Sequence, residues 1–265
     1  MFDYPVIDWW SVRDLMGDPG IVVGRLLDQL ERRPDAEVWK ELEARLVVEG
    51  ECWVSAGFAA LPGLAKLAQS GAETDRHQAL DLAAVIVRTL HRNHENDDLV
   101  RTSPESPAAL RHLAQARLDT SSCITLTKLL QDTLAFAGYT FWAWISLDFA
   151  DEHYHVGCPS CETRLAIVIG DYGHYSAIRH YNDGDIHRVP LNPAAPSEMT
   201  GIGRWMHDTA TMGGDTLLAD GLTYLFGKAT CSACGSTFDL ADRFEAENGP
   251  TQPIDPIVPK TDCST

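Results

Sequence analysis

The sequence is poor in basic residues. Its 265 residues contain 21 Lys and Arg against 38 Asp and Glu, which gives a formal net charge of −17. Binding to a phosphate backbone needs clustered Lys and Arg, and the sequence has no basic run with interleaved aromatic residues. The composition therefore argues against DNA or RNA as a partner, and also against an acidic surface or a membrane. A basic protein partner is favoured instead.

Long apolar segments are missing as well. No run approaches the roughly 20 apolar residues that a membrane-spanning helix needs. Residues 1–20 contain acids, Pro and Gly where a secretory signal has a basic start and an apolar core. We therefore expect a cytoplasmic protein.

The sequence also lacks the common signatures of catalysis and cofactor binding. It contains no Gly-x-Ser-x-Gly elbow, no Walker loop, no His-Glu-x-x-His and no Gly-x-Gly-x-x-Gly after a strand. No familiar enzyme class is therefore indicated. The chain is nevertheless long enough for one large or two ordinary domains with real cores.

Two Cys-x-x-Cys pairs are the strongest signal that is present. Cys158 and Cys161 form the first pair, and Cys231 and Cys234 form the second. Each pair presents two thiols from a tight turn, and two such turns supply the four thiolates of a closed tetrahedral zinc site. The sequence therefore predicts a zinc ribbon with one structural Zn²⁺. Such a site has no open coordination position, which argues against catalysis on the metal.

The spacing of the two pairs is unusual. Residues 162–230 intervene, 69 positions, which is roughly three to four times the common spacing of about 15–20. We therefore expect a ribbon that is interrupted by an insertion. The alternative is two unrelated pairs that are redox-active or disulfide-bonded. The other cysteines fit a reducing cytoplasm better than a disulfide framework, because Cys52 and Cys123 lie in helix-like segments and Cys263 in the tail.

The amino-terminal half shows apolar residues at helical spacing, separated by short polar or Pro-containing segments. Six helices are predicted, over about 21–33, 35–49, 56–70, 74–90, 107–118 and 122–138. Helices of this length joined by short loops indicate stacked antiparallel pairs, as in an α-solenoid. The polar stretch 91–98 is expected to be a connector.

Two stretches of this half carry a family resemblance. Residues 38–46, Val-Trp-Lys-Glu-Leu-Glu-Ala-Arg-Leu, and residues 54–65, with Ala-Ala-Leu-Pro-Gly-Leu at 59–64, resemble HEAT-type repeat proteins of actinobacteria. The resemblance weakens towards residue 135. It implies a HEAT-like α-solenoid and, by analogy only, binding to another macromolecule.

The carboxy-terminal half is predicted to be mixed. Aromatic residues at 139–149 fit either a strand or a helix, and residues 165–169 and 175–180 fit a β-hairpin. Helices are expected over about 197–211 and 215–226. They would form the insertion between the two Cys-x-x-Cys turns, which we call the first and second knuckle. The predicted organisation is a mainly α protein with a helical-repeat domain over 1–138, a zinc-ribbon domain over 139–245 with its insertion at about 197–226, and a disordered tail over 246–265.

Three clusters of His and acidic residues are weaker candidates. The first cluster lies just before Cys158, at residues 148–155, and suggests a second metal site or an acid–base pair. A solvated loop explains it as well. The second lies in the polar connector, and the third in or beside the hairpin. The clusters are, in that order, Asp148, Asp151, Glu152, His153 and His155; His91, His94, Glu95, Asp97 and Asp98; and His174, His180 and His187.

Two function classes follow. The first is a non-enzymatic protein-interaction protein, an adaptor or immunity-like protein, with a structural zinc and a basic partner. The second is an accessory or tailoring enzyme of a biosynthetic cluster that uses the acidic and His residues at 148–155. The sequence names neither the partner nor the oligomeric state.

Overall fold

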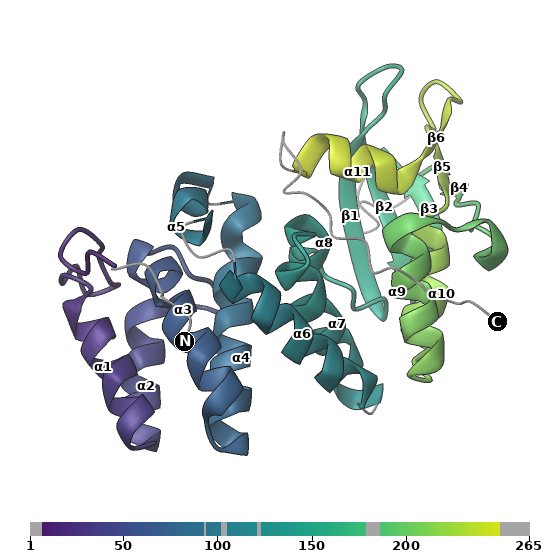
Figure 1. Cartoon of the computed structure of the whole chain (residues 1–265). Coiled ribbons are helices and arrows are strands. Elements are labelled where there is room, and N and C mark those ends of the chain that lie inside the picture. Colours follow the sequence, from purple (N-terminus) through teal and green to yellow (C-terminus); the bar gives the residue numbers. More distant parts are fainter. Residues whose placement is uncertain (1–6, 93, 102–104, 121–122, 179–185, 250–265) are drawn as a thin grey trace. The chain divides into compact units, whose positions relative to one another are not determined.

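A computed structural model describes residues 7–249 except 93, 102–104, 121–122 and 179–185 (Figure 1). The protein is mainly helical, with two small antiparallel sheets. It divides into two units, which are described separately below. In the described part, the helical unit comprises residues 7–120 and 131–144, and the sheet unit comprises residues 123–130 and 145–249.

The helical unit begins with two amphipathic helices, α1 (Ile21–Arg32) and α2 (Ala36–Leu46). Asp35 caps α2, because its side chain accepts a hydrogen bond from the backbone N–H of Glu37 at 2.9 Å. The buried Trp39 of α2 donates its indole N–H to Asp75 at 2.8 Å, so its polar atom is satisfied in the core. Both helices lie where the apolar spacing predicts them.

Helix α3 (Ser55–Ser70) is the centre of the helical unit. Eleven of its residues are buried, and it contacts α1, α4 and α6. A helix that is apolar on most of its surface has to be covered on several sides, and these three neighbours provide the cover. Pro62 lies inside α3 and does not end it.

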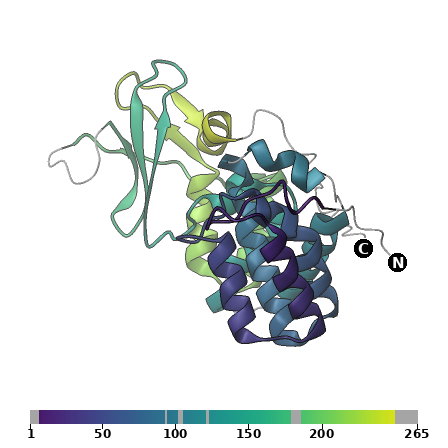
Figure 2. The ribbon, with the colours of Figure 1, turned by 90° about the vertical axis from the view of Figure 1, so that its left-hand side faces the viewer.

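Helix α4 (Glu73–Arg88) returns antiparallel to α3, and successive helices α1 to α4 alternate in direction (Figure 1, Figure 2). The stretch predicted as a polar connector is partly helical. It forms two 3₁₀ turns and a short helix before the two longer helices α6 and α7, with α8 following. The elements are η1 (Thr89–Arg92), η2 (His94–Asn96), α5 (Asp97–Arg101), α6 (Glu105–Asp119), α7 (Cys123–Phe136) and α8 (Thr140–Trp144).

Helix α8 resolves the ambiguity of the aromatic stretch at 139–149 in favour of a short helix, with Phe141 and Trp142 buried. It belongs to the helical unit, beyond the boundary predicted at residue 138. Helix α7 contributes residues 123–130 to the sheet unit and its later turns to the helical unit.

Cys52 is buried between α2 and α3. Its sulfur lies so close to Gly57 that a Cβ at that position would be 2.3 Å away. Burial raises the pKa of the Cys52 thiol from 9.0 to about 12, against a smaller opposite effect of a backbone hydrogen bond with Val54. The folded state therefore keeps a proton that the unfolded state loses above pH 9.

This proton gives a testable pH dependence. The stabilising effect of the neutral Cys52 thiol is complete below pH 9 and is lost as the pH rises from 9 towards 12. We expect the difference in unfolding free energy between wild type and Cys52→Ala to shrink by about 1.4 kcal/mol from pH 8 to pH 10. Urea unfolding at both pH values measures it, and an unchanged difference would contradict the assignment.

The larger sheet of the sheet unit has four antiparallel strands in chain order, β1 (Asp151–Gly157), β2 (Arg164–Gly170), β3 (Gly173–Ala177) and β4 (Val189–Pro190). Strands β2 and β3 confirm the predicted hairpin, whereas β4 lies in a stretch predicted as a loop. The inner strand β2 is buried over all of residues 165–169. A strand with both alternating faces buried needs cover on both sides of the sheet.

Helical elements follow β4 in the sheet unit. The turn η3 (Pro196–Glu198) precedes α9 (Gly201–Met212) and α10 (Thr216–Leu225), which lie at the positions predicted for helices. Helix α10 packs closely on the chain before β1, because a Cβ at Gly221 would lie 2.1 Å from the Phe149 ring. The smaller sheet pairs β5 (Lys228–Thr230) with β6 (Thr237–Asp239).

The last described element is α11 (Leu240–Asn248), which the sequence pattern did not predict. Its Phe244 packs edge-on against Tyr154 of β1, with ring centroids 5.4 Å apart. The stretch predicted as a disordered tail from residue 246 is therefore helical at its start. Residues 250–265 lie outside the described part of the chain.

Candidate metal centre

The first knuckle closes the hairpin of β1 and β2. The last strand pair is Gly157 with Arg164. Beyond it, the N–H of Cys158 donates to the carbonyl of Thr163, and the N–H of Glu162 donates to the carbonyl of Cys158, both at 2.9 Å. Glu162 takes a left-handed backbone conformation (φ 59°). This tight loop turns both cysteine side chains to one side of the hairpin.

The second knuckle repeats this construction between β5 and β6. The N–H of Cys231 donates to the carbonyl of Ser236, and the N–H of Gly235 donates to the carbonyl of Cys231, both at 2.8 Å. Gly235 has the same place in the turn as Glu162 and is also left-handed (φ 76°), which glycine adopts without strain. Two segments 69 residues apart therefore form the same loop.

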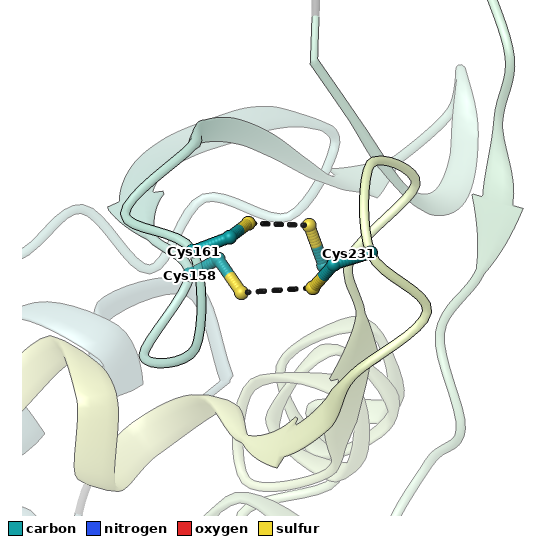
Figure 3. A group of neighbouring side chains, drawn as sticks. Cys158, Cys161 and Cys231 are labelled. Atoms are coloured by element: carbon teal, nitrogen blue, oxygen red, sulfur yellow. Dashed lines mark hydrogen bonds between the residues drawn. The ribbon is translucent and has the colours of Figure 1, made fainter.

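The two knuckles face each other and bring four sulfur atoms together (Figure 3). The sulfurs of Cys158 and Cys234 are 3.7 Å apart, as are those of Cys161 and Cys231. All four lie within 4.8 Å of one another. A tetrahedron of sulfurs about 2.3 Å from a central zinc has edges of about 3.8 Å. The spacing thus fits a metal ion and is too long for disulfide bonds of about 2.05 Å.

Hydrogen bonds hold the knuckles in register. The hydroxyls of Ser160 and Ser236, one from each knuckle, are 2.8 Å apart. The backbone N–H of Ser160 donates to the Cys158 sulfur at 3.4 Å. Cys158 and Cys231 are buried, whereas Cys161 and Cys234 are exposed. One sulfur of each pair therefore anchors the site in the core.

The two exposed thiols have pKa shifts in opposite directions. The side chain and backbone of Thr163 lower the pKa of Cys161 to about 6. For Cys234, a backbone hydrogen bond from Ser236 lowers the pKa, but contact with Cys161, desolvation and the other two thiols outweigh it and raise the pKa to about 12. A second negative charge so close to the first is unfavourable. A divalent cation removes this repulsion and lets all four thiols ionise.

Comparisons of the chain with family models, with curated proteins and with solved structures found no match. The resemblance to HEAT-type repeat proteins therefore stays a prediction. The donor set itself indicates the chemistry of the site. Four thiolates in tetrahedral spacing are typical of Zn²⁺ or of iron–sulfur chemistry, and Cys-x-x-Cys knuckles on short hairpins are typical of structural zinc.

The structure brings the four predicted cysteines together, and among the described residues they are the one group of three or more ligating side chains that converge. The two pairs therefore form one cluster and not two separate groups. Of the remaining cysteines, Cys52 is buried in the helical unit, and the Cys123 side chain and Cys263 lie outside the described residues.

Among the acidic and His residues before the first knuckle, the side chains that the structure describes form no group of three converging ligands. His153 and His155 alternate with Tyr154 along β1, so their rings share one face, with centroids 5.9 Å apart. Asp148 accepts a hydrogen bond from the N–H of Ala150 at 3.1 Å, which is a local turn contact. The side chains of Asp151 and Glu152 lie outside the described part.

Only part of each of the other two clusters is described. In the connector, Glu95 and Asp98 are exposed, and the side chains of His91, His94 and Asp97 lie outside the described residues. Beside the hairpin, the His174 ring stacks on Tyr224 at 3.9 Å, which joins β3 to α10, and His187 is exposed. His180 is not described.

None of the helices in the described residues has the length and apolar character of a membrane span.

Helix α11 supplies site residues that sequence reasoning missed. Glu247 accepts a hydrogen bond from the N–H of Gly157 at 2.7 Å, and Arg243 donates to the carbonyl of Gly157 at 2.8 Å. The two side chains also pair with each other at 2.7 Å. They clamp the residue directly before Cys158. Arg243 and Glu247 stand one helical turn apart, a spacing that is common on exposed helix faces, so the sequence alone did not mark them as site residues.

We expect this clamp to hold the first knuckle in place. Glu247→Ala should lower the unfolding free energy of the sheet unit by about 1–3 kcal/mol, because it removes a charge-assisted hydrogen bond to a half-buried backbone. It should also speed loss of bound metal to a chelator. The matched control is Asp242→Ala, which removes an exposed acid from the same helix; equal effects of both variants would rule the clamp out.

Proposed function

We propose that this chain is a non-enzymatic protein-interaction protein, of adaptor or immunity type, whose sheet unit is a zinc ribbon. One structural Zn²⁺ would be held by Cys158, Cys161, Cys231 and Cys234. The observation that carries the proposal is the convergence of four sulfurs, and no further ligating group, within 4.8 Å in the described part of the chain. A site filled by four protein ligands leaves no position for a water or a substrate.

The bound metal would supply folding free energy. The smaller sheet has only three residues per strand, and the two knuckles are 69 residues apart in the chain. Sheets this small are marginal without another source of stability. Closing a long loop with a metal restricts the unfolded chain, and the metal's binding energy becomes part of the folding energy. Helices α9 and α10 would be an insertion that this closure tolerates.

The helical unit would be the larger recognition surface. Its antiparallel helices are compatible with a HEAT-like solenoid, a scaffold that serves to bind other macromolecules. The net charge of −17 favours a basic protein partner over nucleic acid. The thiols of the site, and the absence of disulfides among the described cysteines, suit a reducing cytoplasm.

A metal analysis tests the proposal against an enzyme built on the residues at 148–155. We expect about one zinc per purified chain, retained when His153 and His155 are both replaced by alanine. Two metals per chain, or loss of zinc in the His153→Ala/His155→Ala variant, would favour a catalytic centre. The rings of these two residues contact each other edge-on, and the variant loses this contact. Circular dichroism therefore has to show that the variant is still folded before its metal content is compared.

A partner analysis tests the second half of the proposal. Cross-linking and affinity capture from the source cells should enrich one protein with a basic surface, at the same level after nuclease treatment. Salt-sensitive retention on heparin, together with loss of the captured material on nuclease treatment, would instead show a nucleic-acid binder.

A further inference from the structure

Exposed apolar side chains of the helical unit gather at one end of its helices. They lie in the segment before α1, in the loop between α2 and α3, and at the end of α8, which packs on η1. Because α1 to α4 alternate in direction, these junctions fall at the same end (Figure 1, Figure 2). We refer to these side chains as the aromatic end: Trp10 (65 % exposed), Met16 (62 %), Val48 (48 %), Trp53 (39 %) and Trp144 (39 %).

The segments that carry the aromatic end are tied to one another. The N–H of Arg13 donates to the Ser55 hydroxyl at 3.0 Å, and its carbonyl accepts from Ala56 at 3.0 Å. The hydroxyl of Thr89, in η1, donates to the carbonyl of Cys52 at 2.9 Å. The apolar side chains are therefore presented on an ordered surface, which lowers the entropy cost of binding a partner there.

Two indoles of this end already bind a cation. The Arg92 guanidinium lies over the Trp53 ring at 5.3 Å and over the Trp144 ring at 5.2 Å. Glu51 is 3.7 Å from the same guanidinium and accepts a hydrogen bond from the Trp144 indole at 3.5 Å. Ring faces beside a carboxylate form a favourable environment for a guanidinium or ammonium group. Arg92 itself remains half exposed, so the arrangement is open to solvent.

The charge around the aromatic end is mainly negative. Its basic side chains have partners within the same end: Arg92 lies over the two indoles, and Arg13 donates to the carbonyls of Trp10 and Val12. Arg45 pairs with Asp14, Asp18 and Glu41. Among the described residues, the acidic side chains at this end that are exposed or half-buried include Asp8, Asp18, Glu49, Glu51, Glu95 and Asp98.

We propose that the aromatic end is the docking surface for a basic, partly apolar peptide segment of a partner protein. This inference rests on the proposed function and names the surface and the chemistry of its partner. Trp and Arg are the side chains that most often dominate binding energy at interfaces, and the acids add selectivity for Lys and Arg. A second copy of this chain would bring its own acids against these, and an anionic membrane would be repelled.

A display library of random 12-residue peptides provides an unbiased probe. We expect selection on the full-length protein to enrich peptides that combine Lys or Arg with apolar residues. Trp53→Ala and Trp144→Ala should each weaken the selected peptides about 10- to 30-fold, as for central interface residues. Met212→Ala, at an exposed apolar residue of the sheet unit (82 %), should leave binding unchanged.

A charge-reversal pair keeps the test valid should a tryptophan variant fold poorly. Glu95→Lys with Asp98→Lys changes two exposed acids of the connector, and should weaken the same peptides about tenfold. The matched control is Asp28→Lys with Glu73→Lys, which makes the same change in net charge at exposed positions away from the aromatic end. Equal weakening by both pairs would show attraction to the net charge alone and overturn the inference.

The outcomes separate this inference from the proposed function. If the affinity of the selected peptides is unchanged by every variant of the aromatic end but is lowered by changes elsewhere, this docking surface is refuted. The proposal that the chain recognises a protein is then unaffected. Enrichment of acidic peptides would refute the partner's chemistry. Failure to enrich any peptide, together with failure to capture a partner from cells, would count against both.

Discussion

Replacing Cys158 with serine is expected to abolish metal binding and to unfold the knuckles of the sheet unit. Cys158 is fully buried, and its sulfur lies 3.7 Å from that of Cys234. Structural zinc contributes roughly 10–16 kcal/mol of apparent binding energy in small zinc domains, and removal of one thiolate forfeits a large part of it. Zinc per purified chain should fall below about a tenth, with a loss of stability above about 4 kcal/mol. Cys231→Ser should behave in the same way.

The matched control is Cys52→Ala, at the other buried cysteine of the described residues, which lies in the helical unit. This variant loses packing against Gly57 and is expected to be moderately less stable, but it should keep its full metal content. Metal analysis and thermal unfolding of the three variants side by side separate the ligands from other buried thiols. Retention of zinc in both ligand variants would contradict the four-sulfur site.

Removing the Arg88 guanidinium should cause the largest loss of stability in the helical unit. Arg88 of α4 pairs with Asp132 of α7, whose side chain is fully buried. Breaking such a pair leaves the buried carboxylate without its guanidinium, and loss of one partner of a buried ion pair costs about 3–5 kcal/mol. We therefore expect Arg88→Met to lower the urea midpoint strongly. The double variant Arg88→Met/Asp132→Leu should recover most of the loss, because the charge is then gone as well.

The exposed ion pair of Lys40 and Glu37 is the control for this cycle. Both side chains are more than two-thirds exposed, so Lys40→Met should cost less than about 1 kcal/mol. A double variant of Arg88 and Asp132 that is no more stable than Arg88→Met would show that the guanidinium acts through packing and not through its charge.

Structural features that depend only on residues close together in the chain were predictable from the sequence. The spacing of the four cysteines predicts their turns, because Cys-x-x-Cys on a short hairpin has few other uses. The apolar spacing of α1 and α2 predicts those helices, because their buried residues repeat every three or four positions. The insertion could be inferred since two half-sites 69 positions apart need something between them.

Contacts between residues that are far apart in the chain were not predictable from the sequence. Arg243 and Glu247 look like an ordinary surface pair until Gly157 is placed beside them. The cation site of Arg92 joins Trp53 and Trp144, which are far apart in the chain, and no local pattern connects them. The polar composition of 91–98 suggested a connector, although tertiary contacts with α3 favour short helices there.

X-ray absorption spectroscopy at the zinc edge of the purified protein tests the central claim most directly. The four-cysteine site predicts about four sulfur scatterers near 2.3 Å and no light-atom ligand. An oxygen or nitrogen scatterer near 2.0–2.2 Å would instead show a bound water, a carboxylate or a histidine such as His153, and would contradict a closed structural centre. A protein purified under reducing conditions that takes up no zinc would contradict the site altogether.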